Sequence, residues 1–174
     1  MQILTTRPDI YLSPFTSSDS TACVELLQEK DVHEGLLLMP YPYGPGDFET
    51  WFSFVAEETA LLQSPGQLAI RQSPGSFLGG IGTKDLVLGH RCEIGYWLGK
   101  PYWGQGVMPT VVGPFCEYLH ETFSLVRITA TVFANNPASM RVLDKCGFQR
   151  EGILRKHYRK HGRFIDGVLF AKVW

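Results

Sequence analysis

The sequence predicts an α/β protein, in which a mixed β-sheet of about seven strands carries helices on both faces. Three observations lead to this prediction. The chain of 174 residues suits one domain, residues 1–174, and is short for two. Short apolar segments with strand patterning alternate with segments of helical spacing, and Gly, Pro or Ser separates them. A strand, a helix and a second buried strand follow one another over residues 92–133, which predicts a right-handed parallel crossover.

The composition is that of an ordinary globular protein, with 44% hydrophobic and 19% charged residues. No apolar run approaches the roughly 20 residues that span a bilayer, and the first residues lack a basic region followed by an apolar core. The four cysteines stand far apart, which favours reduced thiols over a disulfide framework. We therefore expect a cytoplasmic protein without a membrane partner.

The first predicted strand covers residues 9–15 (DIYLSPF), where apolar and polar residues alternate weakly. Ser17 or Ser18 can then cap a helix that runs to about Gln28. The apolar face of this helix comprises Cys23, Leu26 and Leu27. The chain thus begins with one strand followed by one amphipathic helix.

A loop and a second helix follow. The segment 39–47 (MPYPYGPGD) is predicted to be a loop, because its prolines and glycines prevent regular hydrogen bonding. Asp47 is the expected N-cap of a helix over residues 48–62. Its predicted apolar stripe is Trp51, Phe54, Val55 and Leu62.

Three strands and a long helix come next. The strands are predicted at 66–72, 76–88 and 91–99, separated by turn residues. A helix over residues 106–123 follows from the spacing of its larger side chains, which are Val107, Val111, Phe115, Tyr118, Leu119 and Thr122. Pro114 falls inside this helix and predicts a kink, because an interior proline costs about 3 kcal/mol.

The last part of the chain predicts a strand, a helix and two further strands. Residues 126–133 (VRITATVF) are rich in β-branched residues and predict a buried strand. In the helix that follows, Asn136 is the N-cap, Pro137 occupies the first position and Gly147 ends it. Strands at 149–154 and 164–173 are joined by the basic segment 155–163 (RKHYRKHGR).

Two glycines one residue apart, Gly104 and Gly106, lie where the strand at 91–99 leads into the long helix. A helix N-terminus with small residues in front of it binds anions through its unpaired N–H groups. The amides near Gln105, Gly106, Val107 and Met108 could therefore converge on a phosphate. The motif is neither the dinucleotide fingerprint nor a nucleoside-triphosphate loop, since its third position is Pro109 and no Gly-Lys-Ser/Thr ending follows.

Together with the segment 136–148 (NPASMRVLDKCGF), the segment 93–108 (EIGYWLGKPYWGQGVM) resembles the GNAT superfamily of N-acetyltransferases, and within it the RimJ/RimL type. The resemblance covers roughly residues 10–174. It implies a GNAT-like fold whose central twisted sheet splays between its fourth and fifth strands. It also implies acetyl-CoA as co-substrate, with no metal.

The resemblance assigns the coenzyme A contacts. The pyrophosphate would bind at Trp103, Gly104, Gln105, Gly106, Val107 and Met108. The pantetheine arm would pair with the main chain at Tyr96, Trp97 and Leu98. Asn136 would hydrogen-bond the pantetheine end while it caps its helix, and a role as cap alone is the alternative.

Ser139 and Glu93 are the candidate catalytic residues. Many members of the superfamily protonate the departing thiolate with a tyrosine at the position of Leu143, whereas the RimJ/RimL type places a serine where Ser139 stands. A backbone N–H of residues 96–98 would polarise the thioester carbonyl. Glu93 could act as a base through a water molecule, or it could simply pair with a neighbouring cation. Ser139 could likewise serve only to hydrogen-bond the backbone of its turn.

The resemblance implies that the acceptor is an amine, either a protein N-terminus or a small molecule. Residues 1–60 carry ten acidic and two basic side chains, whereas residues 61–174 carry seven and fourteen. This asymmetry suits a cationic acceptor at the early part and polyanionic coenzyme A at the later part. The candidate acceptor contacts are His33, Glu34, Tyr41 and Tyr43, with ordinary loop packing as the alternative.

Other functions remain open at this point. The aromatic and basic residues of 155–163 are also typical of a ribosome- or RNA-binding module, although charge runs of this length are usually solvated and we expect no nucleic-acid partner. A non-catalytic acyl-CoA sensor would keep the glycine turn and Asn136. His157 and His161 fall in a predicted turn without a carboxylate or cysteine nearby, so no metal site is predicted. Either a monomer or a homodimer fits the sequence.

Overall fold

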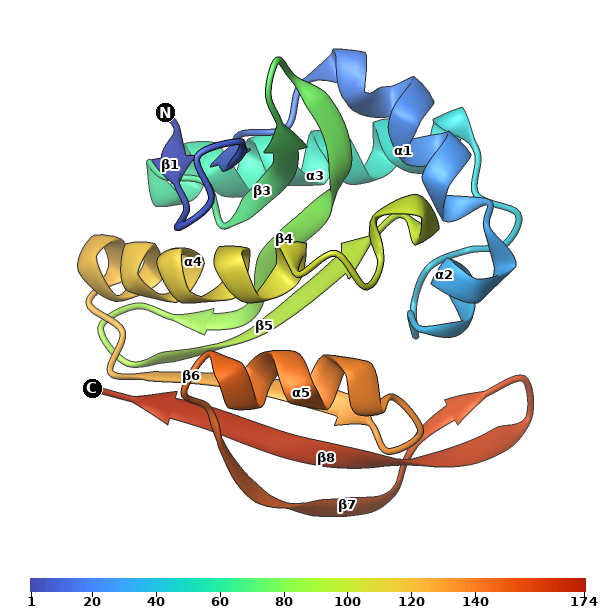
Figure 1. Ribbon diagram of the computed structural model, residues 1–174, viewed down its shortest axis with the longest axis vertical. Coiled ribbons are helices and arrows are strands. Elements are labelled where there is room, and N and C mark those ends of the chain that lie inside the picture. The colour runs from blue at the N-terminus through green and yellow to red at the C-terminus, as the bar shows by residue number, and fades with distance from the viewer. The chain divides into compact units, whose positions relative to one another are not determined.

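The computed structural model describes all residues from 1 to 174, and its eight strands form one mixed sheet of order β1-β2-β3-β4-β5-β6-β8-β7 (Figure 1). The strands are β1 (Ile3–Leu4), β2 (Ile10–Ser13), β3 (Gln67–Gln72), β4 (Ser76–Val87), β5 (Arg91–Leu98), β6 (Arg127–Phe133), β7 (Gln149–Lys160) and β8 (Arg163–Val173). The β5–β6 pair is parallel, whereas β1–β2, β2–β3, β3–β4, β6–β8 and β7–β8 are antiparallel. The predicted mixed α/β fold is thereby confirmed, with β1 as a strand that the sequence did not indicate.

Five α-helices and two short 3₁₀ turns complete the chain. They are η1 (Ser17–Asp19), α1 (Ser20–Leu27), α2 (Lys30–Glu34), α3 (Pro45–Leu62), η2 (Lys100–Tyr102), α4 (Val107–Phe123) and α5 (Pro137–Lys145). Helix α2 was not predicted, because five residues are too few to show helical periodicity. No helix is long and apolar enough to cross a membrane.

The chain divides into two compact units. Unit 1 comprises Met1–Gly82 and Tyr96–Phe115, and unit 2 comprises Thr83–Gly95 and Cys116–Trp174. Strands β4 and β5 each contribute residues to both units. A single domain over residues 1–174 stays a prediction.

Helix α3 begins earlier than the sequence indicated. Gly44 is its N-cap and Pro45 its first residue, while the carboxylate of Asp47 accepts the N–H of Gly44 at 2.8 Å. The prolines and glycines that suggested a loop are compatible with a first helical turn, whose N–H groups have no partner within the helix. The predicted stripe was wrong at Phe54, which is 55% exposed, because the buried face of α3 is centred on Phe48 and Val55.

The core of unit 1 is an apolar cluster built from β3, β4, the first three helices and the segments that follow β2 and precede α3. Its buried members are Phe15, Cys23, Leu27, Val32, Tyr43, Phe48, Ala69 and Phe77. Beside it lies a nearly buried ion pair, in which two guanidinium nitrogens of Arg71 each donate at 2.7 Å to the carboxylate of Asp19. Such a bidentate pair fixes β3 against the start of the first helix, because both side chains are held in one geometry.

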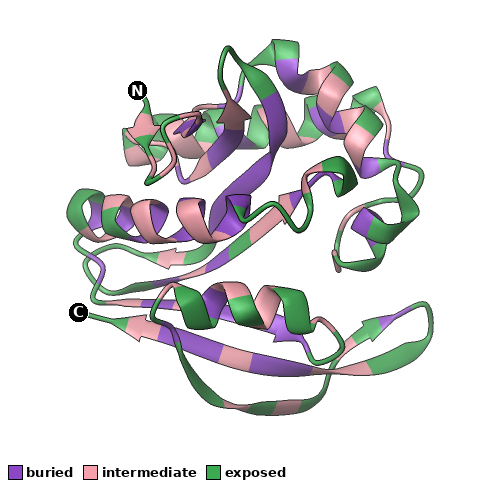
Figure 2. Cartoon of the chain, viewed as in Figure 1, coloured by how far each residue is buried: buried purple, intermediate pink, exposed green.

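Helix α4 continues without a break through Pro114. Of the predicted apolar stripe, Val107, Val111, Phe115 and Leu119 are buried, whereas Thr122 is exposed. Buried and exposed positions alternate along this helix, as expected for a helix with one face in the core (Figure 2). The bend that Pro114 predicts stays a prediction.

Unit 2 is built on β6, the β7–β8 hairpin and α5. Its buried apolar side chains include Leu119, Leu125, Ile128, Leu143, Phe148 and Phe170. Strand β7 continues to Lys160, so most of the basic segment 155–163 lies in a strand rather than in a connecting turn. The strand predicted from the sequence ended at Leu154, where the basic segment begins. The structure has a register shift between Leu154 and Tyr158, after which the strand continues.

Candidate active site

The glycine turn of unit 1 connects β5 to α4. Trp103 precedes it, and the indole Nε1 donates at 2.8 Å to the carbonyl oxygen of Leu98, the last residue of β5. Gly104 and Gly106 both have left-handed backbone conformations, with φ of 73° and 71°. Side chains rarely adopt such angles, so the turn requires glycine at both positions.

Open space surrounds both glycines. A Cβ atom added at Gly104 or Gly106 would meet no atom within 4 Å, so a ligand can approach the main chain closely here. Arg7 lies beside the turn and donates from Nη1 to the carbonyl oxygen of Gln105 at 3.1 Å. The sequence could not indicate this contact, because Arg7 lies 98 positions away along the chain.

The remaining predicted coenzyme A contacts of unit 1 flank the turn. Val107 and Met108 are buried, so their side chains anchor the start of α4 and only their main-chain amides could serve an anion. Leu98 is buried, while Tyr96 and Trp97 are half-buried. Gly79 of β4 lies so close to Trp97 that a Cβ atom there would overlap the Trp97 carbonyl oxygen.

The predicted acceptor residues lie on α2 and the loop after it, also in unit 1. His33 is buried, with Nε2 at 3.0 Å from the carbonyl oxygen of Met39 and its ring 4.7 Å from that of Tyr41. Tyr43 is 3% exposed and belongs to the apolar core. Tyr41 and Glu34 are exposed. His33 and Tyr43 therefore hold the loop together, and Tyr41 and Glu34 are the two that present side chains to solvent.

In unit 2, the parallel pairing of β5 with β6 covers only three residue pairs and ends at Glu93 and Thr129. Glu93 Oε1 accepts the backbone N–H of Thr131 at 3.2 Å, beyond the end of this ladder. Lys84 of β4 lies 3.1 Å from the same oxygen. The carboxylate thus satisfies a main-chain donor where the strands stop pairing, and it is also ion-paired.

Tyr158 of β7 also contacts Thr131, although the sequence did not indicate a role for this tyrosine. Its hydroxyl donates to the carbonyl oxygen of Thr131 at 3.3 Å. Burial raises the pKa of Tyr158, and the negative charge of Glu93 raises it further. The phenol therefore stays protonated at neutral pH and acts as a donor. In the sequence this tyrosine was one aromatic residue within a basic segment.

Helix α5 has the termini that the sequence predicted. Asn136 Oδ1 accepts the N–H of Ser139 at 3.1 Å, and Gly147 has a left-handed backbone with φ of 80°. Ser139 is half-buried in the first turn and is the only residue of α5 with a hydroxyl group. Leu143 is completely buried, so its position serves the core.

The predicted residues thus fall into two groups. The glycine turn, Tyr96, Trp97, Leu98 and the four acceptor residues belong to unit 1, whereas Glu93, Asn136 and Ser139 belong to unit 2. In unit 2 the structure joins Asn136 to Ser139 and Glu93 to Thr131 by hydrogen bonds.

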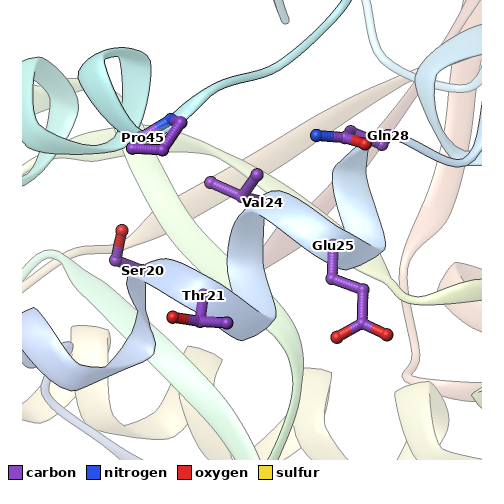
Figure 3. Close-up of a pocket in the computed structure, with 6 residues that line it drawn as sticks. All are labelled: Ser20, Thr21, Val24, Glu25, Gln28 and Pro45. Atoms are coloured by element: carbon purple, nitrogen blue, oxygen red, sulfur yellow. The ribbon is translucent and has the colours of Figure 1, made fainter.

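Two surface hollows of about 470 Å³ are present. The first lies on α1 and the start of α3 and is lined by Ser20, Thr21, Val24, Glu25, Gln28 and Pro45 (Figure 3). It contains none of the predicted site residues. The second belongs to unit 2 and includes Asn135, which directly precedes the N-cap of α5.

The chain is similar to known acetyltransferases. The family model of the acetyltransferase (GNAT) domain matches residues 9–149. The N-acetyltransferase p20 of Bacillus licheniformis is 30% identical over 133 residues, which cover 70% of this chain and 75% of that protein. The ribosomal protein uS5-alanine N-acetyltransferase of Escherichia coli is 30% identical over 82 residues, covering 47% of this chain and 42% of that protein.

A solved structure of RimL, a ribosomal L7/L12 α-N-protein acetyltransferase in complex with coenzyme A, superposes with a TM-score of 0.87. The superposition covers 99% of this chain and 98% of that chain at 18% identity, so it supports the fold alone. The family is shown by the family model, which matches most of the chain. The chain therefore belongs to the acetyltransferases of the GNAT family.

Proposed function

We propose that this acetyltransferase moves an acetyl group from acetyl-CoA to the N-terminal α-amine of a protein or peptide. Two of its relatives are named for acetylating ribosomal proteins, at an alanine of uS5 and at the α-nitrogen of L7/L12. Their similarity to this chain supports the acceptor class, while the features of the chain itself support the donor site and the chemistry.

The observation that carries the donor site is the pair of left-handed glycines in front of α4. Gly104 and Gly106 have open space around them, and α4 is a helix of 17 residues with the positive end of its dipole at this turn. Such a site suits the pyrophosphate of coenzyme A, because main-chain N–H groups and the helix dipole both favour an anion. The guanidinium of Arg7 next to the turn is already paired with Asp9, so it supports the turn through the Gln105 carbonyl.

Bound acetyl-CoA would supply an acetyl group activated as a thioester. Asn136 uses Oδ1 to cap α5, which leaves its Nδ2 group to donate to the pantetheine end. As the amine nitrogen bonds to the acetyl carbon and the C–S bond breaks, we assign Ser139 Oγ to protonate the departing sulfur, and the proton that the nitrogen loses restores the serine hydroxyl. Ser139 lies in the first turn of α5, where the helix dipole stabilises negative charge nearby.

The choice of an α-amine rests on the state of Glu93. Its carboxylate is shared between the N–H of Thr131 and the ammonium of Lys84, and only 20% of the side chain is exposed. A carboxylate held in this way serves the structure and is poorly placed to collect a proton from the acceptor. An α-amine with a pKa near 8 costs about 1.4 kcal/mol to deprotonate at pH 7, whereas a lysine near 10.4 costs about 4.6 kcal/mol. A site without a strong base therefore favours the α-amine.

The test is acceptor-dependent release of coenzyme A from acetyl-CoA, measured with peptides that have free N-termini and with small amines. We expect release with the peptides, and we expect Ser139→Ala to lower kcat by about 10²-fold or more, with a smaller change in the KM for acetyl-CoA. Ser139→Thr keeps a hydroxyl and should retain more activity than the alanine variant. Binding of acetyl-CoA without release on any acceptor would favour an acyl-CoA sensor, and release on small amines alone would contradict the proposed acceptor.

A further inference from the structure

The β7–β8 hairpin of unit 2 carries unpaired positive charge. Between Gly152 and Ile165 the chain has five Lys or Arg residues and no acidic residue. Four of the five, Arg155, Lys156, Arg159 and Arg163, are exposed and form no ion pair. Six cations elsewhere are paired, namely Arg7, Arg71, Lys84, Lys100, Arg127 and Lys172. The hairpin therefore gathers four exposed, unpaired cations within nine residues, with no acidic residue among them.

The local backbone fixes the position of one of these cations. At the register shift between Leu154 and Tyr158, Lys156 adopts a left-handed conformation with φ of 50°. Asp166 Oδ1 holds it there by accepting its backbone N–H at 2.7 Å. Irregularities of this kind re-aim side chains, and here the ammonium of Lys156 lies 6.0 Å from the ring centre of Phe164.

Phe164 and Arg159 complete a basic face around this point. They are direct partners in the β7–β8 ladder, so their side chains lie on the same side of the hairpin. Phe164 is 62% exposed although it is large and apolar. We call Lys156, Arg159 and Phe164 the basic face. It combines two cations with an exposed aromatic ring, which is an arrangement that favours a ligand with negative charges next to apolar groups.

The basic face borders the second hollow of unit 2, whose lining includes the residue before Asn136. Phe164 also lines the second hollow, together with Ala134, Asn135, Ile165 and Asp166. Asn135 precedes Asn136, which caps α5 and which we assign to the reacting end of the donor. A polypeptide whose N-terminus reaches that end can cross the hollow and meet the basic face with its following residues.

Strand β7 adds a main-chain contribution. It is the last strand of the sheet order, so one side of its backbone has no neighbouring strand (β7 in Figure 1). An extended peptide can pair with such an edge, which a folded nucleic acid cannot do. Unit 2 as a whole contains twelve basic and seven acidic side chains, a net charge of +5, against −6 for unit 1 with four and ten. The charge and the open strand edge together favour an acidic peptide over an RNA.

We propose that the basic face binds acidic residues that follow the N-terminal residue of a polypeptide acceptor, and so selects acceptors with an acidic N-terminal segment. This inference rests on the proposed acetylation of α-amines. It assigns Lys156 and Arg159 to acceptor selection and leaves acetyl transfer itself to the residues described above.

The experiment compares two peptides that share the same N-terminal residue and differ only in that one carries Asp and Glu where the other carries Asn and Gln. We expect a KM about threefold to tenfold lower for the acidic peptide, with kcat unchanged. The double variant Lys156→Gln/Arg159→Gln should lose this preference. The control Lys145→Gln/Arg150→Gln removes two other exposed, unpaired cations of unit 2 and should retain it. Added salt should reduce the preference in the wild type.

Equal KM values for the two peptides in the wild type would overturn the inference, as would equal losses in the two double variants. A wild type that acetylates neither peptide would instead refute the proposed function. In that case the role of the basic face is tested separately, by the binding of an N-terminally blocked, fluorescent acidic peptide. Weaker binding to the Lys156/Arg159 variant than to the control variant supports the basic face, and equal binding contradicts it. Displacement of that peptide by single-stranded RNA, without any preference between the two peptides, would assign the face to nucleic acid and overturn the inference.

Discussion

The carboxylate of Glu93 accepts the backbone N–H of Thr131 at 3.2 Å, two residues beyond the last pair of the β5–β6 ladder. A side chain of one strand thus satisfies a main-chain donor of the next strand where their direct pairing has ended. Lys84 pairs with the same oxygen, and Tyr158 donates to the carbonyl of Thr131. Hydrogen bonds to the main-chain N–H and carbonyl of Thr131 therefore fix the point at which the two parallel strands separate.

Substitution of Glu93 distinguishes this structural role from a role as catalytic base. Glu93→Gln keeps an oxygen that can accept the Thr131 N–H but cannot take a proton, whereas Glu93→Ala removes the acceptor. If Glu93 positions β6, the glutamine variant should retain kcat within about threefold. The alanine variant should lose about tenfold in kcat, because the half-buried N–H of Thr131 loses the acceptor that holds β6 in place, at a cost of about 1 kcal/mol. The measurement is kcat against pH for both variants. Equal, large losses in both, with a changed acidic limb, would identify Glu93 as the base.

The glycine turn gives a second prediction. Gly106→Ala should raise the KM for acetyl-CoA and lower the free energy of unfolding by about 1–2 kcal/mol, because alanine is strained at a φ of 71°. Gly113→Ala is the matched control, since Gly113 lies inside α4 with open space around it. This variant should have a free energy of unfolding about 0.5–1 kcal/mol higher than the wild type, because alanine favours a helix interior over glycine. Acetyl-CoA titrations and denaturant unfolding of both variants test this. An unchanged KM in Gly106→Ala would remove the turn from the donor site.

Pro114 is expected to weaken α4. It lacks the N–H that would pair with the carbonyl of Thr110, four residues earlier. Pro114→Ala should therefore raise the free energy of unfolding by about 1–3 kcal/mol, with a rise in Tm of about 2–4 °C for each kcal/mol. Pro109→Ala, in the first turn of the same helix, should change stability by less than about 0.5 kcal/mol. A loss of stability in Pro114→Ala would mean that the proline fits this helix better than alanine does.

Glu117 predicts a pH dependence of stability. The hydrogen bond from Lys172 lowers the pKa of the Glu117 carboxyl below its ordinary value of 4.5, and Trp174 Nε1 also donates to it. A carboxyl with a lowered pKa stabilises the fold above its unfolded pKa, and this stabilisation is lost as the pH falls through the folded value. Glu117→Gln should thus be less stable than the wild type by about 0.2–1 kcal/mol at pH 7, the range for an exposed pair. The difference should shrink below pH 4.5, and a constant difference from pH 7 to pH 2 would contradict this assignment.

Local signals predicted much of the fold. The N-cap Asn136, the first residue Pro137 and the terminator Gly147 defined α5 because each acts within its own turn. The same holds for the glycine turn before α4. Helix α2 and strand β1 were missed, because five and two residues carry no periodic signal.

The candidate site was predictable only as far as neighbouring residues in the chain define it. Arg7 reaches Gln105, and Glu93 reaches Thr131, through contacts across 98 and 38 positions that no local pattern encodes. The ion pair between Lys84 and Glu93 depends in the same way on how β4 and β5 are arranged. The sequence places Glu93 in the strand before the glycine turn. Its contacts with Thr131 and Lys84, which favour a structural role over that of a base, are visible only in the structure.

A single peptide that carries both a free N-terminus and an internal lysine distinguishes the two acceptor amines by the position at which it is acetylated. The peptide is incubated with acetyl-CoA and the protein, and the acetylated nitrogen is mapped by fragmentation mass spectrometry, with a reaction lacking the protein as control. We predict acetylation of the α-amine, with little or none on the lysine. Acetylation of the lysine with an unmodified N-terminus would contradict the proposed acceptor and would require a strong base close to the lysine.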